Sequence, residues 1–133
     1  MQEIPLQVFD FHNHLYPDAL APKCVPYLAQ RFGNAPAFDG TVAGVKKDME
    51  TSGVRAVLNL PVATKPSQVA SINNWAHEND SFPVYSLATI HPELPDLAGE
   101  LHRIRDLGFR GIKLHAEYQL FTLDDPRMNI VWE

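Results

Sequence analysis

Val8-Phe9-Asp10-Phe11-His12-Asn13-His14 is the stretch from which the fold and a candidate site are inferred. It continues an apolar run, and we expect a β-strand from Gln7 to His12. Successive side chains of a strand point to opposite faces, so Asp10, His12 and His14 share one face and the two phenylalanines share the other. Two imidazoles on one face at the end of a strand can bind one metal ion.

Apolar segments rich in β-branched residues alternate with helical patterns along the chain. The further strands are predicted at Val54–Leu60, Val84–Ile90 and Phe109–His115, and the helices at 23–31, 41–52, after Pro66 and at 96–107. Gly53 follows the second of these helices and is expected to end it in the left-handed conformation. This alternation is typical of parallel βα units in an α/β fold.

Four βα units are half of an eight-fold barrel, whose usual length is ~250 residues. Asp124-Asp125-Pro126 is typical of the start of another helix, which would be only a turn or two long at Glu133. We therefore expect residues 1–133 to form a single partial domain, the amino-terminal portion of a (β/α)8 TIM barrel, truncated at its carboxyl end. The open strand edges of such a half-barrel favour self-association, so a homo-oligomer is one expected state.

Composition restricts the class of function. The chain of 133 residues has a formal net charge of −5 and no basic cluster longer than Lys46-Lys47, which argues against binding nucleic acid. No apolar stretch is long enough to cross a bilayer, and the amino terminus has no signal-peptide pattern, so we expect a cytoplasmic protein without a membrane partner. Cys24 is the only cysteine and cannot form an intrachain disulfide. A small-molecule substrate fits these properties.

His12 and His14 are the candidate metal ligands. A catalytic zinc usually has three protein ligands and one position open for water, and this pair supplies two. Asp10 lies one step deeper on the same face, where it either orients an imidazole or is a polar residue of the barrel core. The alternative interpretation of the pair is two partly solvated histidines at a strand end.

Lys113 and His115 are the candidate catalytic residues of the fourth strand. Ile112 and Leu114 suit the side that faces the helices, so Lys113 and His115 are expected to point into the barrel. A lysine there can be carboxylated to bridge two metals, or can hold a substrate carboxylate. His115 can be a ligand, a proton shuttle or a hydrogen-bond donor. The alternative is a lysine reaching to the rim and a core histidine bonded to backbone.

Two further residues are candidates for contact with substrate or with a ligand. His91 closes the third strand, and Pro92 keeps it extended at the mouth of the site, although strand alternation leaves its direction open. Asn59 is a lone polar residue in an apolar strand and either donates a hydrogen bond inward or is a bonded core amide. His77 and His102 lie on the polar flanks of predicted helices and are expected to be solvated.

Four stretches, taken in this order, resemble the amidohydrolase superfamily: Asp10-Phe11-His12-Asn13-His14, Leu60-Pro61-Val62-Ala63-Thr64-Lys65-Pro66, Ile90-His91-Pro92 and Gly108-Phe109-Arg110-Gly111-Ile112-Lys113-Leu114-His115. The most similar branch is the amidohydrolase-related (amidohydrolase 2) group of metal-dependent hydrolases with a TIM-barrel fold, which also contains aminocarboxymuconate semialdehyde decarboxylase. The resemblance implies that His12 and His14 bind a divalent metal, usually zinc. It also implies further ligands after strands five, six and eight, which are not among the strands predicted here.

The resemblance further implies a reaction. A zinc-activated water would attack an amide, ester or lactone of a small molecule at neutral pH. Two alternatives stay open: a zinc-dependent decarboxylase on the same scaffold, and a truncated chain without activity.

Overall fold

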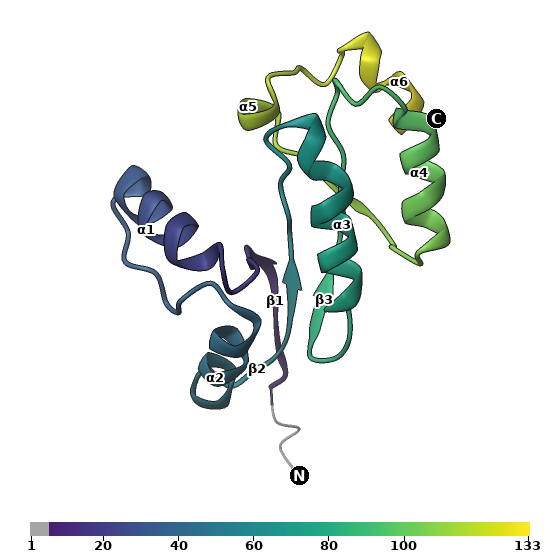
Figure 1. Ribbon diagram of the computed structural model, residues 1–133. Helices are drawn as coiled ribbons and strands as arrows, with labels where there is room; N and C mark the ends of the chain where they lie inside the picture. The colour runs from purple at the N-terminus through teal and green to yellow at the C-terminus, as the bar shows by residue number, and fades with distance from the viewer. Residues whose placement is uncertain (1–5) are drawn as a thin grey trace. The chain divides into compact units, whose positions relative to one another are not determined.

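The computed structural model describes residues 6–133, which form an α/β arrangement of short parallel strands and helices (Figure 1). Its elements in chain order are β1 (Val8–Asn13), α1 (Ala21–Phe32), α2 (Val42–Ser52), β2 (Val54–Asn59), the 3-10 helix η1 (Pro66–Gln68), α3 (Val69–Glu78), β3 (Val84–Ser86), β4 (Ala88–Thr89), α4 (Leu97–Asp106), β5 (Ile112–Lys113), α5 (Ala116–Gln119), the 3-10 helix η2 (Pro126–Met128) and α6 (Asn129–Trp132). None of the helices within this range is both long and apolar enough to span a membrane.

The chain divides into two compact units. Unit 1 comprises Met1–Asn59 and Ser81–Tyr85, and unit 2 comprises Leu60–Asp80 and Ser86–Glu133. The strands form a three-stranded sheet in the order β1-β2-β3 and a two-stranded sheet of β4 and β5. Neighbouring strands in each sheet are thus also neighbours in the sequence, as they are in βα units.

Unit 1 is built on the parallel pair β1 and β2, which lie side by side in Figure 1. Asn13 at the end of β1 is opposite Asn59 at the end of β2. Helix α2 packs against β2 and begins where the Thr41 hydroxyl accepts a hydrogen bond from the Gly44 N–H at 2.8 Å. It ends at Gly53, whose φ of 75° confirms the predicted left-handed terminator.

The two later strands are shorter than predicted. The predicted strand Val84–Ile90 is divided at Leu87 into β3 and β4, and at the end of β3 the Ser86 N–H donates to the Asp80 carboxylate at 3.0 Å. Of the predicted strand Phe109–His115, only β5 is paired as a strand. The Phe109 N–H closes the end of α4 by donating to the Ile104 carbonyl at 3.1 Å.

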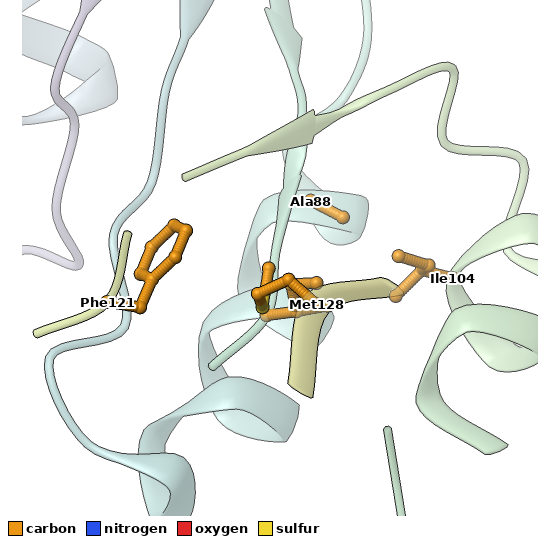
Figure 2. Packing of buried hydrophobic residues seen from close by; sticks show 5 residues of the cluster. Ala88, Ile104, Phe121 and Met128 are labelled. Carbon is orange, nitrogen blue, oxygen red and sulfur yellow. The ribbon is translucent and has the colours of Figure 1, made fainter. Parts of the chain in front are cut away.

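The hydrophobic core of unit 2 gathers residues from β4, α4 and the segment after β5. Figure 2 shows Ala88, Ile104, Phe121 and Met128 of this cluster, which also contains Ile90. Several partly buried residues pack against it: Leu97, Leu101, Phe109, Ile112, Leu114 and Val131. Phe121 is therefore a core residue, which the sequence alone did not predict.

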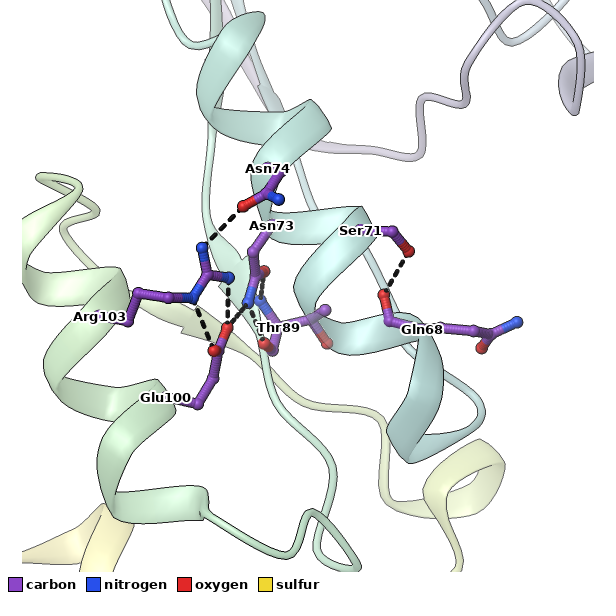
Figure 3. A network of polar contacts seen from close by, with 7 residues as sticks. All are labelled: Gln68, Ser71, Asn73, Asn74, Thr89, Glu100 and Arg103. Atoms are coloured by element: carbon purple, nitrogen blue, oxygen red, sulfur yellow. Dashed lines mark hydrogen bonds and ion pairs between the residues drawn. The ribbon is translucent and has the colours of Figure 1, made fainter.

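A polar network centred on Asn73 joins α3, β4 and α4 within unit 2 (Figure 3). The side chain of Asn73 is fully buried; it accepts from the Thr89 N–H at 2.8 Å and donates to the Thr89 carbonyl at 2.9 Å and to Glu100 at 2.7 Å. Burial acts to raise the pKa of Glu100, but hydrogen bonds from Arg103 and Asn73 outweigh it, so this pKa lies below its ordinary value. The amide thus replaces ladder bonds that the short strand cannot make.

We expect Asn73→Ala to lower the free energy of unfolding by about 2–4 kcal/mol, because it leaves the buried N–H and carbonyl of Thr89 without partners. Asn74→Ala is the matched control, since Asn74 is exposed on the same helix and bonds only to Arg103; its effect should be within about 0.5 kcal/mol. Urea denaturation followed by circular dichroism measures both. Equal losses for the two variants would show that the network does not stabilise unit 2.

Candidate functional site

The two candidate metal ligands lie next to each other in unit 1. His12 is exposed near the end of β1, and His14 is half-buried just after it. Their ring centroids are 5.2 Å apart, and the ring planes make an angle of 71°. Such a separation is consistent with two side chains on one face of the chain, two residues apart.

The distance between the two ring centroids can be compared with the distance expected for two histidine ligands of one zinc ion. A zinc–nitrogen bond is about 2.0–2.1 Å, and the centre of an imidazole lies about 1.1–1.2 Å beyond the nitrogen, so two tetrahedral ligands have centroids about 5.2 Å apart. The measured 5.2 Å agrees with this estimate. Two imidazoles are also a donor set that zinc accepts. The separation of the two rings is therefore compatible with two ligands of one zinc ion, and it is also that of two imidazoles in edge-to-face contact.

The backbone on both sides of the histidine pair is held by hydrogen bonds from neighbouring side chains. The Asp10 carboxylate accepts from the His12 N–H at 2.9 Å, so Asp10 positions this histidine through its backbone. The Asn59 carbonyl oxygen accepts from the Leu15 N–H at 2.9 Å. Asn59 is fully buried, and this bond gives it a structural function at the end of β2.

Asn13, between the two histidines, contains an unsatisfied donor. It is only 7% exposed, and its Nδ2 has no hydrogen-bond partner in the described part of the chain. Leaving a buried donor unpaired costs about 1–3 kcal/mol, and such groups are rare in native structures. The His12-Asn13-His14 segment therefore contains one buried donor that no described residue satisfies.

A third ligand is not present beside the pair. Among residues 6–133, no group of three or more histidine, cysteine or carboxylate side chains is placed to hold a metal ion. Cys24 is half-buried and has a free thiol. The described residues thus include two candidate ligands, one fewer than the three that a catalytic zinc usually has.

Lys113 and His115 lie on one side of the strand segment that contains β5 in unit 2. Ile112 and Leu114 pack against the buried cluster, so the intervening side chains alternate to the other side. Both Lys113 and His115 are half-buried. The core side predicted for Ile112 and Leu114 is therefore observed, whereas the direction of Lys113 and His115 into a barrel stays a prediction; β5 itself is only two residues long.

The ring of His115 is bonded to a neighbouring backbone N–H, which limits the roles that this histidine can have. Its Nδ1 accepts from the Tyr118 N–H at 3.4 Å, which caps α5, and its ring lies 4.2 Å from the Tyr118 ring. When Nδ1 accepts in the neutral imidazole, the proton is on Nε2. Of the three roles predicted for His115, this arrangement favours the hydrogen-bond donor.

Gln119 was not predicted from the sequence, and it organises this part of unit 2. It is 2% exposed; its Oε1 accepts from the His115 N–H at 2.8 Å. Its Nε2 donates to the Ala63 carbonyl at 3.0 Å and to the Ile90 carbonyl. One side chain therefore joins the segments that follow β2, β4 and β5. No sequence signal marks it, because glutamine is mostly exposed in proteins.

His91 is buried after β4, at 4% exposure. Its Nδ1 accepts from the Glu93 N–H at 3.2 Å. Burial lowers the pKa of His91, the charge of Glu93 acts against this, and Arg127 lowers the pKa further. The imidazole is thus held neutral and bonded to the backbone beside it.

The candidate residues are distributed over the two units. Asp10, His12, His14 and Asn59 belong to unit 1, and His91, Lys113 and His115 belong to unit 2. His77 and His102 are exposed on α3 and α4, as predicted. Comparison of the chain with models of known families, with curated proteins and with solved structures found no match.

The lowered pKa of His91 predicts a pH dependence of stability. The folded-state pKa of His91 is below the ordinary 6.5. The contribution of His91 to the free energy of unfolding is therefore complete above about pH 6.5, and it is lost as the pH falls from there through the folded-state pKa. Denaturation between about pH 7.5 and 5.5 should show a shallower loss of stability for His91→Gln than for the unmodified chain. His102→Gln, on the exposed face of α4, is the control. An unchanged slope in His91→Gln would contradict the prediction.

Proposed function

We propose that this chain contributes to a metal-dependent hydrolase of the amidohydrolase type, with His12 and His14 as ligands of a divalent ion, zinc by preference. One observation carries the proposal: the 5.2 Å separation of the two imidazole rings fits two ligands of one tetrahedral ion. The reaction class comes from the sequence resemblance to amidohydrolase-related enzymes.

The fold is compatible with this proposal. The order β1-β2-β3 follows the sequence, β1 pairs with β2 in parallel, and β4 pairs with β5 in parallel. In the chain, helices lie between β1 and β2, between β2 and β3, and between β4 and β5. We propose that these units are part of a (β/α)8 barrel, in which catalytic residues lie at the carboxyl ends of the strands. The histidine pair is at that end of β1.

The chemistry divides between the ion and the residues of this chain. When bound, the ion activates water for attack on an amide, ester or lactone carbonyl of a small molecule. His12 and His14 hold the ion through neutral imidazole nitrogens, and Asp10 and Asn59 fix the backbone on either side of them. Within unit 2, Lys113 and the Nε2–H of His115 offer hydrogen-bond donors to a ligand.

The first test is zinc binding. The variants His12→Ala and His14→Ala each remove one of the two histidine ligands. Each should weaken zinc binding by at least ~10-fold. His77→Ala and His102→Ala are matched controls on exposed helical surfaces and should bind zinc like the unmodified chain. Competition with a chromophoric chelator measures the affinities, and circular dichroism checks that each variant is folded. Unchanged zinc affinity in a His12→Ala, His14→Ala double variant would contradict the assignment of the pair.

The same variants test the reaction. Within the complete barrel that the proposal requires, the zinc-loaded protein should hydrolyse members of a panel of amides, esters and lactones, with loss of activity in His12→Ala and retention in His77→Ala. Carbon dioxide release from unsaturated carboxylates, measured in parallel, separates the decarboxylase alternative from hydrolysis. Hydrolysis that persists after complete removal of metal would contradict a metal-dependent mechanism.

A further inference from the structure

We propose that Lys113 and His115 form a binding point for a carboxylate within unit 2, in which the ammonium of Lys113 and the Nε2–H of His115 donate to the anion. The binding point itself is built within unit 2 and needs no metal.

The two side chains come from alternate positions of one extended segment. Ile112 and Leu114 pack against the buried cluster, so strand alternation assigns Lys113 and His115 to the opposite side of that segment. Residues two apart along an extended chain are separated by about 6.6 Å. The four-carbon stem of a lysine spans that separation easily, so its ammonium and an imidazole N–H can meet the two oxygens of one carboxylate.

The charge of Lys113 has no counter-ion in the described part of the chain. The ion pairs observed there use arginines: Arg103 with Glu100, Arg105 with Asp106, and Arg127 with Asp125 and Glu93. Lys113 is half-buried as a residue and makes none. Its ammonium is therefore available to a bound carboxylate, with which it would make a charge-assisted hydrogen bond.

His115 also favours a carboxylate as the ligand. Its Nδ1 is occupied by the Tyr118 N–H, and the neutral ring therefore presents an N–H at Nε2. The binding point thus offers an ammonium and an imidazole N–H, both donors. A carboxylate accepts from both and compensates the charge, whereas a neutral amide leaves the ammonium uncompensated.

Buried side chains hold the backbone of both residues. Gln119 accepts from the His115 N–H at 2.8 Å, and the Thr89 hydroxyl donates to the Lys113 carbonyl at 3.3 Å. Gln119 and Thr89 are 2% and 0% exposed. The positions of the two donors are therefore set before a ligand arrives, which reduces the entropy lost on binding.

The test is a titration of chelator-treated, isotopically labelled chain with benzoate, benzamide and inorganic phosphate, followed by NMR. Benzoate should shift the signals of Lys113 and His115 with a saturating curve, and benzamide should bind at least ~10-fold more weakly, because it has the same shape without the charge. Lys113→Met should weaken benzoate binding at least ~10-fold, and Lys47→Met, an exposed lysine of α2, should not. His115→Phe keeps the ring stacked on Tyr118 but removes the Nε2–H, and it provides a second variant should Lys113→Met not fold.

Three results would overturn the proposal: equal binding of benzoate and benzamide, benzoate binding unchanged in both Lys113→Met and His115→Phe, or phosphate bound more tightly than benzoate. Because the titration uses metal-free chain, its failure leaves the zinc ligands untouched. Conversely, if the unmodified chain does not bind zinc, the hydrolase proposal is contradicted. The carboxylate titration can still be interpreted in that case.

Discussion

Buried amide side chains satisfy the backbone where the strands end, and both units depend on this. The paired strands β4 and β5 are two residues long, so their ladder leaves polar groups that must find other partners. Asn59 binds the Leu15 N–H, Asn73 binds both backbone groups of Thr89, and Gln119 binds three segments. All three amides are at most 2% exposed, so these bonds are shielded from competition with water.

Hydrogen bonds to the backbone also distinguish the histidines by how well they can bind a metal. His12 and His14 stand at an exposed or half-exposed strand end, with their backbone held by Asp10 and Asn59, so their rings can adjust to a shared ion. At His91 and His115, Nδ1 instead accepts from a backbone N–H. An imidazole whose Nδ1 accepts presents only an N–H at Nε2 and is a poor metal ligand, because a ligating nitrogen must offer a lone pair. A metal is therefore expected at the first pair and hydrogen bonding at His115.

Patterns in a short stretch of sequence predict the features that interactions between residues close in sequence determine. Alternation predicts β1 and β2 to within one residue, and the caps at Thr41, Gly53 and Asp96 act between residues close in sequence. The division of the third strand, the helix α5 and the position of Gln119 were not predicted. The two bonds from the Gln119 Nε2 join residues 56 and 29 positions apart, and periodicity over a short window contains no information about such contacts. The candidate histidine pair was visible in sequence only because its two members are two residues apart.

The two candidate binding points suit ligands of opposite charge. With a formal net charge of −5, the chain repels an anionic ligand at long range. That repulsion is screened over a Debye length of about 8 Å at physiological ionic strength, so short contacts decide which ligand binds. The ammonium of Lys113 and the His115 N–H would attract a carboxylate over such a distance, and two neutral imidazoles would bind a cation without adding negative charge. Under the proposal, the binding of an anionic ligand by an acidic protein has to come from a few fixed donors, and the buried amide of Gln119 holds the backbone of one of them in place.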